Sequence, residues 1–198
     1  MILSFRALTA CLLALCLCAV VQAPLYAFAP EKGMFLIANE QLPDPRFRDR
    51  VILLIQHDSQ GSAGLVVNRA SRLPLATLLP EKSKLAGRGI SLSYGGPVEP
   101  DTLLALVTVR NNPPEPADEI LGNLYVTGVG VLDEWPEFTA EVVDFRAFVG
   151  YTGWAPGQLD AEMQRGDWSV VPADEKSIFT DEGGQLWERL RAGVLQKD

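Results

Sequence analysis

The chain has 198 residues, with 17 basic and 25 acidic side chains and a formal net charge of -8. This length predicts one domain, and the acidic balance disfavours broad binding to nucleic-acid phosphates, which requires a basic surface. The cysteines are Cys11, Cys16 and Cys18. From position 19 onward the chain therefore has no internal disulfide, no Cys-ligated zinc and no thiol nucleophile.

The first element along the chain has the pattern of a secretory signal peptide. A single basic residue, Arg6, precedes an apolar run over 7–21, and small residues follow. We expect cleavage after Ala27, so that residues 1–27 form the leader and residues 28–198 form a single domain. Loss of Arg6 with the leader would change the net charge to 16 − 25 = -9.

Two other interpretations of the leader stay open. The uncharged stretch 7–30 is long enough to span a bilayer, so residues 1–27 could be an uncleaved anchor in the inner membrane. A mis-assigned start codon on a cytoplasmic protein is the other alternative. Cleaved export to the periplasm or the medium is the interpretation that we favour.

Short apolar segments with β-branched residues dominate the rest of the chain. The run VILLIQHD at 51–58 is apolar on both faces, which predicts a buried strand. GSAG at 61–64 is small and flexible, so we predict a hairpin turn there. The predicted strands are 33–39, 51–58, 64–69, 90–96, 102–109, 124–132, 145–151 and 168–173. We expect loops at 81–89 and 110–119.

Helical patterns are fewer and are concentrated late in the chain. Proline at both ends of 74–80 predicts a short helical turn. A helix is predicted over 156–166, where Leu159 and Met163 share one face, and an amphipathic helix over 184–195. Many strands with few helices predict an α+β domain.

His57 is the only histidine, which excludes sites that need two histidines. It is a weak candidate for a general base. Asp58 is its neighbour in sequence, but adjacent strand residues point to opposite faces, so Asp58 is not expected to orient the imidazole. The structural alternative is a hydrogen-bonding role for His57 at the end of its strand.

Several common catalytic motifs are absent. GSAG lacks the G-x-S-x-G turn of serine hydrolases, and no Walker-type phosphate loop occurs. GVGVLD at 128–133 has two glycines spaced as in a dinucleotide loop, but we interpret it as part of a strand because the third glycine and a following helix are missing. Glu115, Asp118 and Glu119 are expected to be solvated rather than to bind calcium. We therefore expect no cofactor and no metal.

Two further groups of side chains can be interpreted as structural or as functional. Arg46, Arg48 and Arg50 would form a basic stripe on a strand, which is more typical of a solvated edge than of a nucleic-acid contact. Trp154 and Trp168 flank the predicted helix and are expected to pack it onto the sheet. An aromatic-lined pocket is the alternative.

Several segments, taken together, resemble the YqgE/AlgH family of bacterial proteins. They are GMFLIA at 33–38, LPDPRFRDRVILLIQHD at 42–58, GLVVNR at 64–69, GGPVEPD at 95–101 and FVGYTGWAPGQLDAEMQRGDWSVVPAD at 148–174. The resemblance extends over nearly all of the chain from residue 33. It implies a curved, largely antiparallel and partly barrel-like β-sheet with flanking helices. It implies little about chemistry, although some members carry the label of transcriptional regulator.

The resemblance also marks positions that match the family motifs. They are Asp44, Phe47, His57, Gly64, Asn68, Gly95, Gly96, Pro97, Gly153, Trp154, Gly157, Gln158 and Glu162. One departure is at 106–107, where many relatives carry Leu-His and this chain has Leu-Val. A second is the leader, because relatives usually begin near the first strand and act in the cytoplasm. A protein outside the cytoplasm cannot regulate a promoter directly, so the regulator label transfers poorly.

The sequence leads to three functional hypotheses. The first is an exported, non-enzymatic binding or accessory protein with a protein or envelope partner, whose binding surface includes Asn68, Gly95, Gly96, Trp154, Gln158 and Glu162. The second is a hydrolase-like enzyme that uses His57 as base, with Asn68, Gln158 or Glu162 nearby. The third is a DNA-binding regulator, which the leader and the acidic charge disfavour. Membrane association is expected only if the leader stays uncleaved.

Overall fold

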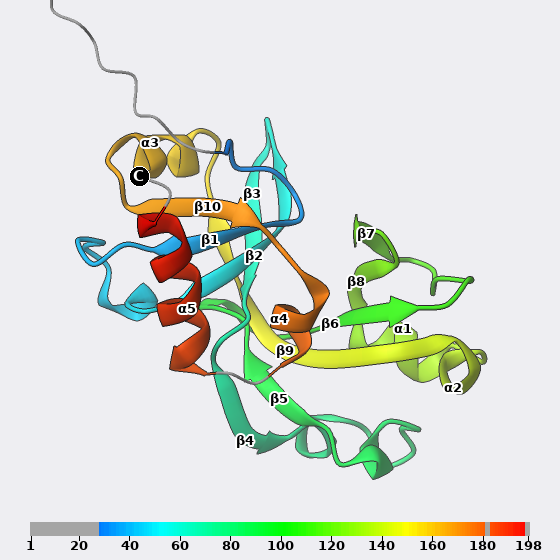
Figure 1. Cartoon of the computed structure of the whole chain (residues 1–198). Coiled ribbons are helices and arrows are strands. Elements are labelled where there is room, and N and C mark those ends of the chain that lie inside the picture. The colour runs from blue at the N-terminus through cyan, green and yellow to red at the C-terminus, as the bar shows by residue number, and fades with distance from the viewer. Residues whose placement is uncertain (1–27, 181–182, 197–198) are drawn as a thin grey trace, which may run out of the picture.

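The structure is a computed structural model that describes residues 28–180 and 183–196. The strands are β1 (Met34–Ala38), β2 (Val51–Asp58), β3 (Gly61–Val66), β4 (Ala70–Pro74), β5 (Ser91–Tyr94), β6 (Val98–Val109), β7 (Asp118–Leu121), β8 (Leu124–Gly128), β9 (Val142–Trp154) and β10 (Trp168–Pro172). The helices are α1 (Val129–Glu134), α2 (Phe138–Glu141), α3 (Gln158–Gln164), α4 (Glu175–Phe179) and α5 (Gly184–Leu195). Short 3-10 helices span Pro45–Phe47, Leu75–Leu78 and Ala86–Arg88. Figure 1 shows their arrangement.

One curved sheet contains all ten described strands, in the order β10-β1-β2-β3-β9-β6-β8-β7, with β4 and β5 off this path. Among these strands the only parallel pair is β5 with β9. The long strand β9 pairs with β3 over 152–154 and with β6 over 142–151, so it joins the two halves of the sheet. The sheet curves without closing. The predicted α+β class with a largely antiparallel, curved sheet is confirmed.

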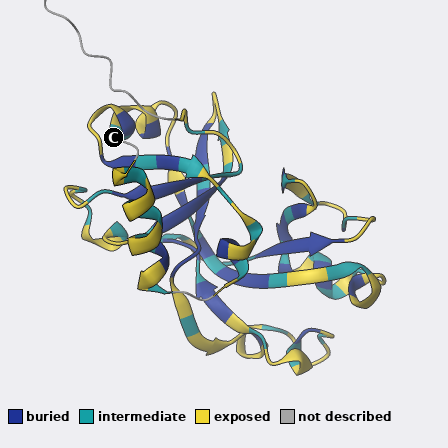
Figure 2. Ribbon diagram, viewed as in Figure 1, coloured by how far each residue is buried: buried dark blue, intermediate teal, exposed yellow. Residues whose placement is uncertain are grey.

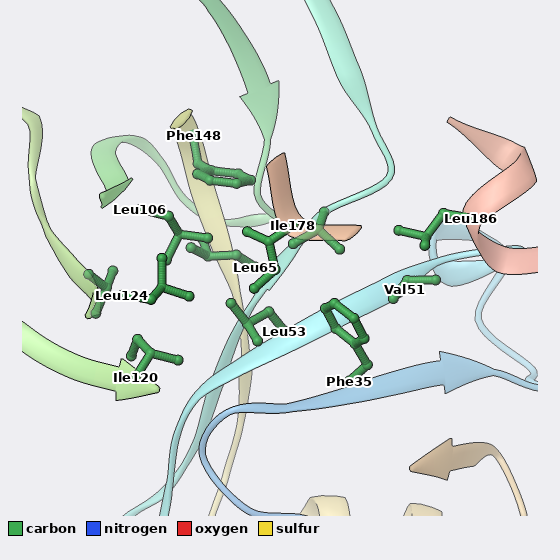
Figure 3. Close-up of a cluster of buried hydrophobic side chains, with 12 residues drawn as sticks. Phe35, Val51, Leu53, Leu65, Leu106, Ile120, Leu124, Phe148, Ile178 and Leu186 are labelled. Carbon is green, nitrogen blue, oxygen red and sulfur yellow. The ribbon is translucent and has the colours of Figure 1, made fainter. Parts of the chain in front are cut away.

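Apolar side chains on both faces of the sheet explain the continuous hydrophobic runs in the sequence. Along β1, Phe35 packs inside the curve and Leu36 packs with α3 on the other face. The side chains inside the curve form one buried cluster, the inner cluster, which draws residues from strands and from α4 and α5 (Figure 3). Its buried members are Phe35, Val51, Leu53, Leu65, Val67, Leu106, Ile120, Leu124, Val126, Phe148, Ile178 and Leu186. Figure 2 shows that burial follows the strands, whereas much of the outer surface of α5 is exposed. Each fully buried side chain of this kind stabilises the fold by about 1.5–3 kcal/mol.

The prediction of a hairpin turn at GSAG is wrong. The turn lies at residues 59–60, and residues 61–66 form strand β3 between β2 and β9. The glycines of this segment are required because β2 and β9 pack closely against β3, and not because the chain must be flexible there. A Cβ on Gly64 would lie 2.5 Å from Ile52 Cγ2, and one on Gly61 would lie 2.5 Å from the Trp154 carbonyl oxygen.

Two other segments differ from the sequence predictions. The strand predicted over 124–132 ends at Gly128, and the next residues form α1, with Val129 and Leu132 buried. A helix therefore does follow the glycine pair of the segment 128–133, contrary to the prediction. The third glycine of a dinucleotide-binding loop is still missing. The loop predicted over 110–119 ends early, because β7 begins at Asp118 and pairs with β8.

The arginine stripe predicted for a strand at 46–50 does not form. Pro45 begins a 3-10 helix, and the Asp44 carboxylate caps it by accepting the Arg46 backbone N–H at 2.9 Å. The local turn chemistry of Asp-Pro overrides the alternation of the sequence. The arginines therefore do not share one strand face.

The predicted leader at 1–27 lies outside the described residues. In the two described ranges, no helix has the length and apolar composition required to cross a membrane.

Candidate functional site

A carboxylate, Glu162, joins two tryptophans at one end of the sheet. Its Oε2 accepts hydrogen bonds from Trp154 Nε1 and from Trp168 Nε1, each at 2.8 Å. Its Oε1 accepts a third from Gln158 Nε2 at 3.0 Å. Because an indole nitrogen only donates, Glu162 Oε2 acts as an acceptor for both rings. The two tryptophan side chains are therefore held in fixed orientations.

The side chains around Glu162 come from three consecutive elements of the chain. Trp154 ends β9, Trp168 begins β10, and Gln158 and Glu162 lie four residues apart on one face of α3. The turn into α3 places Gly157 at φ +73°, a conformation that glycine adopts without strain. Gln158 Oε1 accepts the Ala155 backbone N–H at 3.1 Å, which fixes the same turn from the other side.

The aromatic rings form one wall of a cavity of about 340 Å³. Trp168 packs edge to face against Trp154 at 6.0 Å between ring centroids and against Phe47 at 5.9 Å. The cavity, named here the Glu162 cleft, is lined by Leu42, Pro43, Asp44, Arg46, Phe47, Pro97, Val98, Gly153, Trp154, Gln158, Glu162, Arg165, Asp167 and Trp168. Aromatic walls with a few fixed polar groups are typical of binding sites.

Two ion pairs stand among the residues that line the Glu162 cleft. Arg46 Nη2 lies 2.6 Å from Asp44 Oδ2, and Arg165 Nη2 lies 2.6 Å from Asp167 Oδ2. The hydrogen bonds from the Arg46 side chain lower the pKa of Asp44 below its ordinary value of 3.8. Both arginine side chains are more than half exposed, at 63% and 56%, so each guanidinium can also meet solvent or a ligand.

The other residues predicted for the binding surface have structural contacts. Asn68 is buried, accepts the Val51 backbone N–H at 3.0 Å and donates to the Asp49 carbonyl at 2.8 Å. A Cβ on Gly95 would lie 2.2 Å from the Gly150 carbonyl oxygen. Gly96 likewise packs against the backbone of residue 151. These three residues hold the strands and loops around the cleft and do not line it.

His57 lies in a different cavity, of about 380 Å³, between β2 and β7. Its Nδ1 is 2.8 Å from Ser62 Oγ, directly across the β2–β3 pair. The residues that line this cavity include none of Asn68, Gln158 and Glu162. The grouping required by the hydrolase hypothesis is therefore not formed around His57 in the described part of the chain.

Sequence reasoning identified much of the Glu162 cleft. The predicted binding surface included Trp154, Gln158 and Glu162, which come together, and the alternative of an aromatic-lined pocket included Trp168. The family motifs marked four further lining residues, which are Asp44, Phe47, Pro97 and Gly153. Arg165 and Asp167 were missed. The only available signal was their position in the segment that links the predicted helix to Trp168.

The described residues contain no group of three or more His, Cys, Asp or Glu side chains placed to hold a metal ion. At the position where the family resemblance implies Leu-His, Leu106 and Val107 are both fully buried and pack into different apolar clusters.

Comparison with known proteins gives consistent matches over most of the chain. The model of the AlgH-like family matches residues 35–194. A UPF0301 protein of Mycobacteroides abscessus is 38% identical over 162 residues, which cover 80% of this chain and 77% of that protein. A UPF0301 protein of Rhodococcus jostii is 38% identical over 162 residues, 80% of each chain.

Solved structures show the same fold. The solution structure of the AlgH protein from Pseudomonas aeruginosa has a TM-score of 0.66 and 30% identity, over 87% of this chain and 89% of that chain. The crystal structure of protein DIP2367 from Corynebacterium diphtheriae has a TM-score of 0.70 over 82% and 86% of the two chains. At 24% identity, the second match concerns the fold alone.

Proposed function

Since this chain belongs to the AlgH-like family of uncharacterised proteins, we propose from its geometry that it is a binding protein and that its primary site is the Glu162 cleft. The observation that carries this proposal is the state of the carboxylates in the cleft. Glu162 already accepts three hydrogen bonds, and Asp44 and Asp167 are each paired with an arginine. A general base instead needs a lone pair directed at the substrate.

The walls of the Glu162 cleft suit recognition by shape. Trp154 and Trp168 are almost fully buried and are held by Glu162, so they form a rigid support for the wall, and little side-chain entropy is lost there when a ligand binds. The exposed Arg46 and Arg165 side chains add hydrogen-bond donors at the mouth. An apolar group carried by a polar partner, such as a protein or an envelope component, would match these surfaces.

Export is part of the same proposal and rests on the leader. The apolar run after Arg6 and the small residue Ala27 support cleavage and a place outside the cytoplasm. The test is cell fractionation with N-terminal sequencing of the native protein. A mature start at Phe28 in the periplasm supports export, whereas a chain that keeps Met1 in the cytoplasmic fraction contradicts it.

Binding at the Glu162 cleft can be tested by photo-cross-linking in the native host. The exposed residue Pro43 lines the cleft and is replaced by p-benzoylphenylalanine. The matched control carries the same amino acid at Glu81, which is exposed and does not line the cleft. We expect a discrete adduct from position 43 and none from position 81. Identical adducts, or no adduct from position 43, would contradict the proposal.

A steric variant separates the cleft from the surrounding surface. Gly153 lines the cleft and is exposed, and a Cβ there would make ordinary contacts of 3.6 Å. We therefore expect the rest of the side chain in Gly153→Leu to project into the open mouth of the cleft and to obstruct it. We expect the variant to abolish the adduct from position 43 while the unfolding midpoint stays near that of the parent protein.

A further inference from the structure

A second cleft, separate from the Glu162 cleft, lies between β2 on one side and β7 and β8 on the other. Two adjoining cavities of about 790 and 380 Å³ share Ile55, Asp118 and Val126 as lining residues. They are therefore treated as one feature, the β2–β7 cleft. It shares no lining residue with the Glu162 cleft.

The β2 side of the β2–β7 cleft is an edge of the sheet, whereas the opposite side is formed by the loop 115–117, the start of β7 and residues of β6 and β8. β1 pairs with β2 only over 51–53, whereas β3 pairs with β2 as far as Asp58. Among the described strands, none pairs with residues 55–58 on the side that β1 leaves. β7 is the last strand in the order of the sheet and pairs with β8 alone. Figure 1 shows β7 and β8 standing apart from β2 and β3.

The gap is fixed at one end by direct contact between the two halves. A Cβ on Gly33, the residue before β1, would lie 3.0 Å from the Ile120 carbonyl oxygen and 3.5 Å from Leu121 Cβ. Ile120 is itself buried in the inner cluster. The cleft is therefore a preformed feature of the curved sheet, and a strand that entered it would meet positioned walls.

Polarity within the cleft defines what could enter it. Ile55 and Leu104 are partly buried members of the inner cluster, so they give the cleft an apolar floor. Around the floor stand three carboxylates, Asp58, Glu115 and Asp118, against one ammonium, that of Lys32. The complementary ligand has apolar side chains directed at the floor and basic side chains directed at the rim.

An extended peptide meets both requirements at once. Successive side chains of a strand point to opposite sides, so an alternating sequence presents apolar groups to one side and charged groups to the other. A free sheet edge supplies backbone hydrogen bonds to an added strand, which is a recurring mode of peptide recognition. Unprotected edges are otherwise a liability, because they invite pairing with other chains.

We propose that the β2–β7 cleft binds an extended segment of a partner protein in which basic and apolar residues alternate, and that this segment adds as a strand to the unpaired edge of β2 at residues 55–58. The proposal goes beyond the function proposed for the Glu162 cleft and stands independently of it. Failure of the cross-linking experiment at Pro43 leaves it unaffected.

The test uses the protein purified from its native host and a fluorescein-labelled octapeptide of alternating Val and Lys, with binding followed by fluorescence anisotropy. We expect this peptide to bind about tenfold more tightly than the Val–Glu octapeptide, because the rim is acidic. Methylation of alternate backbone nitrogens should weaken binding about tenfold, because it removes the donors that pair with a strand edge.

Matched variants locate the binding. Asp118→Lys should weaken binding of the Val–Lys peptide about tenfold, and Glu115→Lys, on the loop before β7, provides a second variant if Asp118→Lys disturbs the strand. Glu81→Lys makes the same charge change on an exposed loop outside the cleft and should change affinity less than about twofold. No binding below about 1 mM peptide, equal binding of the methylated peptide, or an equal effect of Glu81→Lys would each overturn the proposal.

Discussion

Glu162 is the residue on which the geometry of the aromatic wall depends. Its replacement by alanine leaves the indole N–H groups of Trp154 and Trp168 without their acceptor, and both rings are at least 93% buried. Because each unsatisfied buried donor costs about 1–3 kcal/mol, Glu162→Ala should lower the free energy of unfolding by about 3 kcal/mol. Urea unfolding followed by tryptophan fluorescence measures the change.

Glu162→Gln is the matched control for that prediction. Glutamine keeps a carbonyl oxygen that can accept from both indoles, while its amide meets the Gln158 Nε2 donor in place of an acceptor. The expected loss is therefore smaller, about 1 kcal/mol. If the alanine and glutamine variants lose equal stability, the indole hydrogen bonds are not what stabilises this region.

Asp44 provides a prediction about pH. Its pKa is lowered chiefly by the hydrogen bonds from the Arg46 side chain, so the pair contributes stability above the ordinary pKa of 3.8. That contribution is lost as the pH falls through the lowered pKa of the folded state. Arg46→Met should therefore reduce the urea midpoint at pH 6 and have a smaller effect at the most acidic pH that the fold tolerates. Arg48→Met, an exposed neighbour, is the control, and an effect of Arg46→Met that does not change with pH would exclude this role.

At the residue scale, the sequence located several side chains of the Glu162 cleft, but it did not indicate their contacts. The family motif marked Trp154, Gln158 and Glu162, and the last two lie within the helix predicted over 156–166. The partnership of Glu162 with Trp168 crosses from α3 to β10, and no local pattern records which hydrogen bonds form across that turn. Asn68 illustrates the opposite error, because a buried side chain that satisfies two backbone groups resembles a binding residue when only its motif is visible.

At the scale of elements, β3 depends on small residues. A Cβ on Gly64 would meet Ile52 Cγ2 at 2.5 Å, the Leu53 carbonyl at 2.9 Å and Thr152 Oγ1 at 3.0 Å. Overpacking of this kind costs about 1–3 kcal/mol, so Gly64→Ala should lower the free energy of unfolding by about that amount. Thermal and urea unfolding of the variant measure the loss.

Gly130→Ala is the control for Gly64→Ala. Gly130 is exposed in α1, and a Cβ there would meet nothing within 4 Å. Gly130 lies in the first turn of α1, where the preference of about 1 kcal/mol for alanine over glycine in a helix interior applies only in part, so this variant should be neutral or slightly stabilised. An equal loss in both variants would mean that the crowding around Gly64 is not the cause.

Predictions of the elements succeeded where periodicity decides and failed where tertiary packing does. Apolar runs located β1, β2 and β10, and the 3.6-residue pattern located α3 and α5. The GSAG segment carries no side-chain pattern, because its role is to let β2 and β9 approach β3 closely. Likewise, Asp118 and Glu119 look like loop residues, yet pairing with β8 makes them part of a strand.

At the scale of the molecule, α+β composition followed from the count of strands and helices, whereas the curvature of the sheet was expected only from the family resemblance. The bend depends on β9 pairing with β3 near Trp154 and with β6 and β5 along its earlier residues. These partners are separated by long stretches of chain, so no window of sequence contains the information. The curvature in turn creates both clefts, because it brings segments from different halves of the chain to the same surface.

The contact between Gly33 and β7 allows this curvature to be tested directly. A Cβ on Gly33 would lie 3.5 Å from Leu121 Cβ, which is within the range that a disulfide requires. In a chain whose native cysteines at positions 11, 16 and 18 are serine, the Gly33→Cys/Leu121→Cys variant should therefore form this bond on oxidation. The two positions are 121 − 33 = 88 residues apart, so the cross-link should add up to about 4 kcal/mol.

Strain reduces the expected gain from the cross-link. Gly33 has a φ of +84°, and a non-glycine residue there costs about 1 kcal/mol or more, so a net gain of about 3 kcal/mol is expected over the parent protein. The reduced form of the same variant carries the same strain, so the gain over that form is the full contribution of the cross-link. A thiol assay and urea unfolding with and without dithiothreitol measure bond formation and stability. The single variant Gly33→Cys isolates the strain. Thiols that stay free under oxidising conditions would show that the two halves of the sheet do not meet at this point.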